Sequence, residues 1–505
     1  MNFKRIIALF LVSQMLVMNF ASCSDTTVDE TEKVSEDTAA VETSGETEPA
    51  ETEFDRRSVS DELPEITFGG RDFRFLVNEG EMFQLVSDDD SGVGLDSVIY
   101  DRNKRVEDRF DVKITADYQL GTESQDIINN YASTGEHIAE VCDHWHRMGL
   151  SPVCYFHWLS WLDIPHFNWE QPWWNKEANE SAYIKGKLFT VTGDLSVTSM
   201  QDTWAIAFNM DLIKDYGYTA DELYNTVFDG EWTLDKLIEI GSSMYKDVNG
   251  NGEEDLGDIY GYMCDTTNRT MPWVTSIGEK FFTITEDRTN IEITLGTEKV
   301  YSALEKLCNF HHNVIGTYSL GNQEEDAVVT NKQIATKEFV EGRVGLYPTT
   351  FESCYTDFTN LEFTYGMLPF PKYDTAQERY LTVPEYDFSV YGVPVTLPME
   401  DYEMVGVVME ALMAESWKTV TPAYYDEALK GRYSADETTA RMIDLIMDGR
   451  VFDWGYQVAI YLTCKFPYLF CYQINDNNID LASTMAAGME DNVWRIQDVL
   501  SFYDD

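Results

Sequence analysis

The chain has 505 residues, of which 89 are Asp or Glu and only 36 are Lys or Arg, for a formal net charge of −53. Neutralising nucleic-acid phosphates requires clustered Lys and Arg, so this balance excludes nucleic acid as a partner. Beyond an apolar leader and an acidic segment, roughly 450 residues remain without a membrane-length apolar run. That length is too great for one hydrophobic core and predicts two large lobes.

Residues 1–22 predict a secretory signal peptide. Lys4 and Arg5 precede an apolar run over 6–20, which is shorter than the ~20 residues of a permanent anchor. Residues 20–23 (FASC) resemble a bacterial lipoprotein cleavage box, although Phe20 replaces its usual leucine. We therefore expect a diacylglycerol on Cys23, since two acyl chains attach a protein stably to a membrane. The alternative is an ordinary signal peptide with an incidental cysteine.

The segment after Cys23 predicts a disordered tether. Residues 24–53 hold eleven acidic residues, one lysine and no aromatic residue. Such a segment cannot bury enough apolar surface to offset its ordering entropy. We expect the lipidated cysteine and this acidic tether to occupy residues 23–62.

The folded body opens with alternating strand and helix patterns. The sequence predicts a strand over 72–77, a helix over 97–110, and strands over 111–115 and 138–142. This alternation is typical of an α/β lobe, where ligands gather at the carboxyl ends of strands. A later amphipathic helix is predicted over 232–247, with Thr233 as its N-cap.

Residues 247–258 match a twelve-residue calcium loop. Side-chain oxygens fall at positions 1, 3, 5, 9 and 12, a glycine stands at position 6, and position 7 would offer its carbonyl. The expected ligands of a structural calcium ion are Asp247, Asn249, Asn251, Glu253, Asp255 and Asp258. Asp258 stands where such loops usually carry Glu, and the alternative is a solvated Asn-Gly turn without metal.

Several further blocks occur in a fixed order. They are 170–175 (EQPWWN), 186–189 (GKLF), 193–194 (GD), 204–209 (WAIAFN), 211–212 (DL), 232–237 (WTLDKL), 260–262 (YGY), 339–350 (FVEGRVGLYPTT) and 365–372 (YGMLPFPK). Together they resemble extracellular solute-binding proteins of family 1, which serve ABC-type sugar importers. The branch is that of large lipoproteins from Gram-positive gut bacteria, and the resemblance covers residues 71–494.

The resemblance implies an α/β, two-lobe, periplasmic-binding-protein-like fold of type 2, with a hinge of crossing strands. A first crossing is expected near Asn209, a return through the strand over 388–393, and another crossing over 451–457. The expected domains are lobe 1 over 63–207, lobe 2 over 208–387, a return to lobe 1 over 388–450, and a C-terminal crossing with lobe 2 helices over 451–505.

The resemblance further implies a monomeric receptor, not an enzyme, that binds a carbohydrate (an oligosaccharide) at the outer face of the membrane and passes it to ABC permease subunits. Sugars offer flat C–H faces to aromatic rings and hydroxyls to carboxylates. Asp202 and Trp204 stand where similar proteins bind a sugar hydroxyl and line the cleft, and Phe351 stands where they stack an aromatic ring. The candidate ligand-binding residues are Asp143, His144, Trp145, Asp202, Trp204, Phe351 and Trp454.

Other functions remain open on the sequence. An exported glycoside hydrolase would need two carboxylates facing one bond, and no block singles out such a pair. No GxSxG, HExxH or P-loop occurs either. A peptide- or metal-binding receptor on the same scaffold is the third possibility, because a fold does not fix a ligand.

Overall fold

The computed structural model describes residues 55–119, 123–150, 157–266, 269–321, 330–425, 437–457 and 468–504. The expected signal peptide, Cys23 and most of the expected tether lie outside the described residues. Within these ranges, no helix combines the length and the apolar character needed to span a bilayer.

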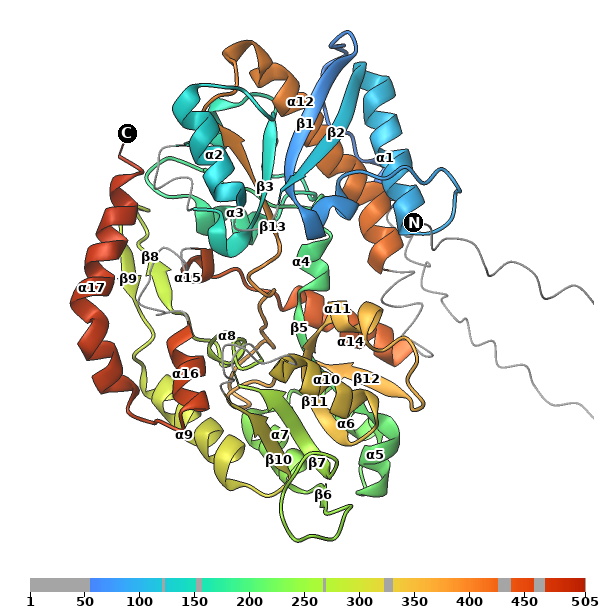
Figure 1. Cartoon of the computed structure of the whole chain (residues 1–505), viewed down its shortest axis with the longest axis vertical. Coiled ribbons are helices and arrows are strands. Elements are labelled where there is room, and N and C mark those ends of the chain that lie inside the picture. Colours follow the sequence, from blue (N-terminus) through green and yellow to red (C-terminus); the bar gives the residue numbers. More distant parts are fainter. Residues whose placement is uncertain are drawn as a thin grey trace, which may run out of the picture. The chain divides into compact units, whose positions relative to one another are not determined.

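Five strands form the first sheet, in the order β2-β1-β3-β13-β4. Their bounds are β1 (Arg71–Asn78), β2 (Val112–Gln119), β3 (Val141–Trp145), β4 (Trp158–Leu159) and β13 (Ser389–Pro394). β1 pairs in parallel with β2 and β3, whereas β13 is antiparallel to β3 and β4. In Figure 1, brown β13 lies among the blue and teal strands, so the chain returns to this sheet late in the sequence.

The second sheet has the order β10-β7-β11-β5-β12, with β6 beside β7. Its strands are β5 (Trp204–Asn209), β6 (Tyr245–Lys246), β7 (Ile259–Asp265), β10 (Thr317–Leu320), β11 (Val344–Thr350) and β12 (Tyr365–Leu368). Every residue of β5 and β11 is buried, as expected for strands covered on both faces. A separate hairpin pairs β8 (Phe282–Ile284) with β9 (Ile291–Ile293).

Helices cover both sheets (Figure 1). Near the first sheet are α1 (Leu95–Phe110), α2 (Glu123–Thr134), α3 (Lys176–Ala182), α4 (Thr198–Gln201) and α12 (Tyr402–Glu415). The others are α5 (Met210–Asp215), α6 (Ala220–Phe228), α7 (Leu234–Ser242), α8 (Trp273–Ser276), α9 (Glu298–Asn313), α10 (Asn331–Val340), α11 (Phe351–Thr356), α14 (Glu437–Asp448), α15 (Trp454–Gln457), α16 (Leu469–Asn475) and α17 (Leu481–Ser501). Short 3₁₀ turns are η1 (Arg56–Ser58), η2 (Glu79–Gln84), η3 (His146–Met148), η5 (Trp161–Asp163) and η6 (Met399–Asp401), and η7 (Ser416–Val420) is a π-helical turn.

Local patterns account for several elements. Thr233 caps α7 by accepting a hydrogen bond from the Lys236 amide at 3.3 Å, as its position predicts. The strand predicted over 138–142 instead begins at Val141. Glu140, just before it, uses its carboxylate to bind the Arg74 side chain and amide. The strand ends at Trp145.

The chain passes between the sheets at paired extended segments. Thr203 bridges Pro384, and Thr382 bridges Arg450. All of β5 belongs to the second sheet, and Asn209, expected near the crossing, instead caps α5 by accepting from two amides. The chain returns to the first sheet through β13 (Ser389–Pro394), within one residue of the strand predicted over 388–393. α14 contacts β12, so residues 437–448 already lie against the second sheet, ahead of the expected boundary at 450.

Candidate functional site: an acidic groove at the crossing segments

Two carboxylates lie on the adjacent crossing segments. Asp202 ends α4, where its amide donates to the Thr198 carbonyl at 2.8 Å. Its own carbonyl accepts from the Glu385 amide at 2.7 Å. This backbone pairing fixes Asp202 and Glu385 beside each other at the passage between the two sheets.

The end of β3 and the turn η2 supply a second group of side chains. The Trp145 indole donates to Glu81 Oε1 at 3.4 Å. Asp143 Oδ2 accepts from the Ser389 hydroxyl at 2.9 Å and from Gln84 Nε2 at 3.4 Å. These hydrogen bonds therefore hold η2 against β3 and β13. They place the carboxyl groups of Glu81 and Asp143 on the same side of β3.

Aromatic rings adjoin these acids. The Arg147 guanidinium is bound to Asp387 and lies 4.8 Å from the Trp145 ring centroid and 5.2 Å from that of Tyr386. Tyr386 in turn meets Tyr468 edge to face, with centroids 5.5 Å apart. Planar groups of this kind suit the flat faces of sugar rings.

The carboxylates lie close enough to raise one another's pKa. Burial raises the pKa of Asp202 well above its usual range, and Glu385, Glu81, Glu352 and Asp387 add to the effect. Burial likewise raises the pKa of Glu81 and of Glu385 to about 7 each. These side chains are partly exposed, and the protein around them disfavours their charged forms.

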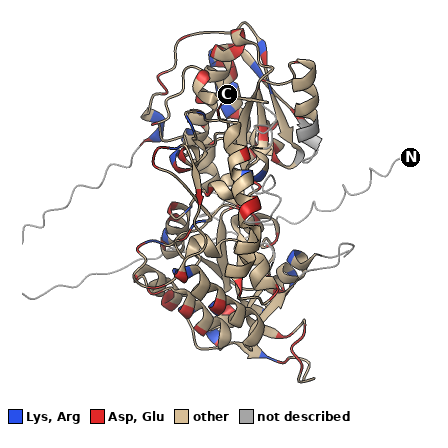
Figure 2. Ribbon diagram, turned by 90° about the vertical axis from the view of Figure 1, so that its left-hand side faces the viewer, with Lys and Arg blue, Asp and Glu red and all other residues tan. Residues whose placement is uncertain are grey.

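We call this set the acidic groove. It comprises Glu81, Asp143, Trp145, Arg147, Asp202, Glu352, Glu385, Tyr386, Asp387 and Tyr468. Acidic side chains are spread over many other helices and loops of the described chain (Figure 2). The acidic groove is distinguished by the convergence of its carboxylates and not by acidity alone.

The structure brings together three of the seven candidate ligand-binding residues, namely Asp143, Trp145 and Asp202, of which Asp143 is itself buried. His144 lies on the opposite face of β3, because neighbouring residues of a strand point to opposite sides. It packs edge to face on Trp158, with centroids 5.5 Å apart, and burial lowers its pKa to about 4. His144 is therefore a core residue.

The other three candidates offer little surface to the groove. Phe351 is fully buried, and its amide donates to the Thr203 carbonyl at 3.2 Å. Trp204 is 2 % exposed and lies under the Arg269 guanidinium, 5.8 Å from the ring centroid. Trp454 lines a cavity of about 360 Å³ whose described lining includes no residue of the acidic groove.

Sequence reasoning missed Glu81, Arg147, Glu385 and Asp387. Glu385 and Asp387 could have been candidates from the sequence, because they flank Tyr386 directly before the strand predicted over 388–393. Glu81 has no comparable signal, since its place in the groove depends on how η2 folds back onto β3.

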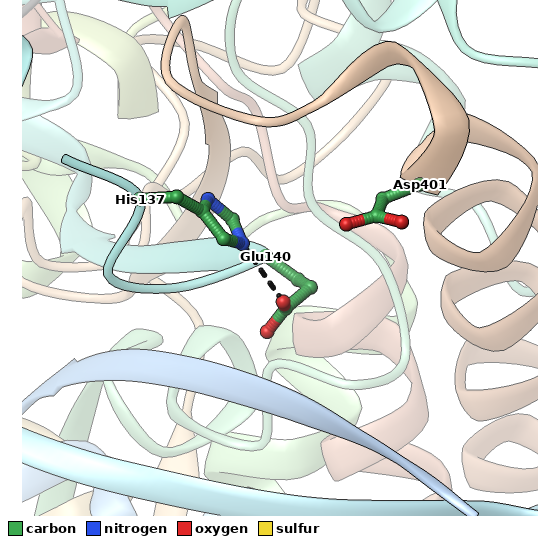
Figure 3. Close-up of side chains that lie close together, drawn as sticks. All are labelled: His137, Glu140 and Asp401. Atoms are coloured by element: carbon green, nitrogen blue, oxygen red, sulfur yellow. Dashed lines mark hydrogen bonds and ion pairs between the residues drawn. The ribbon is translucent and has the colours of Figure 1, made fainter. Parts of the chain in front are cut away.

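Among the described residues, one group of three has ligand atoms close enough to share a metal ion, namely His137, Glu140 and Asp401. Figure 3 shows His137 directed at Glu140, with Nε2 and Oε1 2.9 Å apart. Both Glu140 oxygens also accept from the Arg74 guanidinium, and Asp401 pairs with Arg71. Burial alone would raise the pKa of Glu140, but these hydrogen bonds lower it to about 2. The carboxylates are already satisfied, so we assign no metal here.

Hydrogen bonds within the loop over 247–258 close a turn around Asp247. Asp247 accepts from the amides of Gly250 and Gly252 at 2.6 and 2.8 Å, and these glycines have φ angles of 74° and 77°. Buried Asp258 accepts from the Val248 amide at 2.9 Å. The asparagine side chains at positions 3 and 5 both donate to Asp255, at 3.0 and 2.7 Å. The side-chain oxygens of Asn249 and Asn251 accept from the backbone amides two residues further on, at 2.9 and 2.7 Å.

Comparison with solved structures shows which known fold this chain has. No family model and no curated protein matches the sequence. UspC of Mycobacterium tuberculosis superposes with a TM-score of 0.53 at 12% identity, over 84% of this chain and 100% of that one. UgpB of the same organism, in complex with glycerophosphocholine, gives 0.52 at 15%, over 86% and 99%. A cyclo/maltodextrin-binding protein complexed with maltotetraose gives 0.51 at 12%, over 86% and 96%. The α/β fold of two-lobe solute-binding proteins, predicted from the sequence, is confirmed.

Proposed function

We propose that this chain, which has the fold of two-lobe solute-binding proteins, is a receptor that captures a carbohydrate in its acidic groove and delivers it to an ABC permease. The observation that carries the proposal is the convergence of carboxylates and aromatic rings where the crossing segments meet. Asp202 and Glu385 offer acceptors for hydroxyl groups, and Trp145 offers an aromatic edge.

The fold by itself leaves the ligand open. One structure of this fold holds maltotetraose and another holds glycerophosphocholine, so the ligand must be argued from the site. An oligosaccharide suits a groove in which acceptors and rings alternate over several side chains. A peptide ligand would instead need unpaired backbone groups or apolar pockets to define its register.

The same carboxylates could in principle serve a hydrolase, so the test must separate binding from turnover. The protein is incubated with a panel of neutral, amino and acidic glycans, and its melting temperature and the glycan products are both measured. Stabilisation without products supports the receptor. Product formation identifies a hydrolase, and stabilisation by peptides alone contradicts the carbohydrate assignment.

For its location, we propose a monomer attached through a diacylated Cys23 to the outer face of the cell membrane. The support is the signal segment and cleavage box of the sequence, followed by a segment too acidic to fold alone. A tethered receptor stays at high effective concentration near its permease.

We also propose that the loop over 247–258 binds a structural calcium ion. The residues that would hold it are Asp247, Asn249, Asn251, Glu253, Asp255 and Asp258, with Glu253 acting through its carbonyl. Support comes from the donor set, which is all oxygen as a hard cation prefers, and from the two left-handed glycines that let the loop turn inward. Calcium titration followed by thermal unfolding tests this proposal directly.

A further inference from the structure

A cavity of about 520 Å³ opens among the helices of the second sheet. Its described lining comes from the end of α6, from α14 and from the segment over 372–380. Both helices contact β12 (Figure 1). No residue of the acidic groove is part of this described lining, and the volume is typical of small-molecule sites. We call it the α6–α14 cavity.

Lys372 forms part of the wall of the α6–α14 cavity and is only 3 % exposed. Its amide donates to the Trp232 carbonyl at 3.2 Å, and its carbonyl accepts from the Leu234 amide at 2.8 Å. Its Nζ lies 5.1 Å from the centroid of the Tyr380 ring and 3.1 Å from the point that a Cβ on Gly230 would occupy. Tyr380 and Gly230 line the same cavity. The ammonium group therefore lies at the cavity wall, and the missing Cβ leaves its Gly230 side open.

The ammonium group of Lys372 has no acceptor. Within the described ranges, its Nζ forms neither an ion pair nor a hydrogen bond, and it contacts the face of the Tyr380 ring. The Tyr380 hydroxyl is engaged elsewhere, since it donates to the Val227 carbonyl at 2.9 Å and accepts from the Trp232 amide at 3.3 Å. A buried ammonium group without an acceptor is strongly destabilising, and one cation–π contact offsets only part of that effect. This arrangement indicates an anionic group that a ligand supplies.

Two guanidinium groups of the same lining have donors to spare. Arg441 lies over the Phe228 ring, with its guanidinium carbon 4.4 Å from the ring centroid. Arg379 uses Nη2 to donate to the Asp448 carbonyl at 2.6 Å. Neither guanidinium forms an ion pair with another residue of the described chain. Since a guanidinium has five N–H donors, both can still donate to an anion that enters the cavity.

The acids of the lining decide which class of anion fits. Glu378, Asp444 and Asp448 also line the cavity, so a phosphate dianion would bring a second negative charge towards them. A single carboxylate brings only the one charge that Lys372 lacks. Hydroxyl or amino groups on the same ligand could donate to the acids of the lining. Apolar side chains such as Leu445 provide a surface for a short carbon skeleton.

We propose that the α6–α14 cavity binds a small organic monocarboxylate, a hydroxy acid or an amino acid, with its carboxylate against the Lys372 ammonium group. Arg379 and Arg441 provide further donors to the ligand. This site is separate from the acidic groove, and its occupation goes beyond the proposed function.

The stability of the empty protein distinguishes a binding residue from a structural one. If Lys372 serves the fold through its contact with Tyr380, Lys372→Met loses that contact and is less stable than the wild type. If the ammonium group awaits an anion, Lys372→Met removes an unpaired buried charge. The variant is then at least as stable as the wild type without ligand, and it gains no stability from a carboxylate.

Isothermal titration calorimetry and thermal unfolding of the full chain test the proposal. The probes are sodium L-lactate, sodium gluconate, L-serine and L-proline, with lactamide as the neutral counterpart of lactate and with inorganic phosphate and chloride as other anions at equal ionic strength. We expect saturable binding of at least one monocarboxylate and none of lactamide or chloride. Lys372→Met should weaken that binding about tenfold or more, and Arg441→Gln should weaken it severalfold. The matched control Lys214→Met, at an exposed position on α5, should keep the wild-type affinity.

Each contrary result overturns the proposal. Absence of saturable binding by every monocarboxylate up to about 10 mM refutes the site. Equal binding by the wild type and Lys372→Met refutes the role of the ammonium group, and tighter binding of phosphate than of any carboxylate refutes the ligand class. Should Lys372→Met fail to fold, unchanged binding by Arg441→Gln refutes the assignment of the carboxylate to this cavity.

Discussion

Replacing Glu385 by glutamine should stabilise the ligand-free protein above neutral pH. Burial raises the pKa of Glu385 from 4.5 to about 7. A raised carboxyl pKa leaves stability intact below about pH 4.5 and lowers it as pH rises through about 7. A pKa raised from 4.5 to about 7 corresponds to about 3 kcal/mol of unfolding free energy. Because the Glu385 side chain is partly exposed, solvent screens part of this effect, and we expect a measured gain of about 1–2 kcal/mol for Glu385→Gln.

The assay is chemical denaturation of the wild type, Glu385→Gln and the control Glu305→Gln, at an exposed position on α9, at pH 4.5 and pH 8. The wild type and the variant should be equally stable at the lower pH, and the variant should be more stable at the higher pH. Since Asp202 and Glu81 titrate together with Glu385, the effects of several substitutions will not add. A Glu385→Gln variant that is less stable than the wild type at pH 8 would refute the electrostatic description of the groove.

Three further predictions concern separate parts of the chain. Asp202→Asn should weaken binding of the cognate sugar by roughly 1–3 kcal/mol in calorimetry, and an unchanged affinity removes Asp202 from the site. Calcium should raise the melting temperature of the wild type but not of Asp247→Ala, and an equal response to chelator in both proteins counts against the metal. Cys23→Ser should shift the protein from the membrane fraction to the medium, and retention on the membrane contradicts lipid attachment at that residue.

Local sequence patterns predicted much of the secondary structure, because apolar periodicity and helix-capping residues act over only a few neighbouring residues. The apolar runs of β1 and β13 and the helical stripe of α1 were predicted within two residues of their observed bounds. The helix predicted over 232–247 ends earlier, at Ser242, and Tyr245 and Lys246 form the strand β6 instead. β3 lies three residues later than predicted, at Val141–Trp145, and Glu140 just ahead of it binds Arg74.

The site was predicted less completely, for a physical reason. Asp202 was a candidate from the sequence because it lies just before the strand of the 204–209 block, and the structure places it beside Glu385; its role in ligand binding stays a prediction. Glu81 and Glu385 acquire their properties only when η2 and the return segment lie near Asp202, and no local pattern encodes that proximity. The aromatic candidates Trp204 and Phe351 lie at suitable positions in the chain, but the helices around the second sheet bury their rings.

The most direct test of the carbohydrate receptor is calorimetric titration of the wild type and Trp145→Ala with the glycan that gives the largest thermal shift, followed by analysis of the glycan. We predict saturable binding to the wild type, markedly weaker binding to Trp145→Ala, and recovery of the glycan intact. Cleaved glycan, or equal binding by both proteins, would contradict a carbohydrate receptor whose ligand lies in the acidic groove.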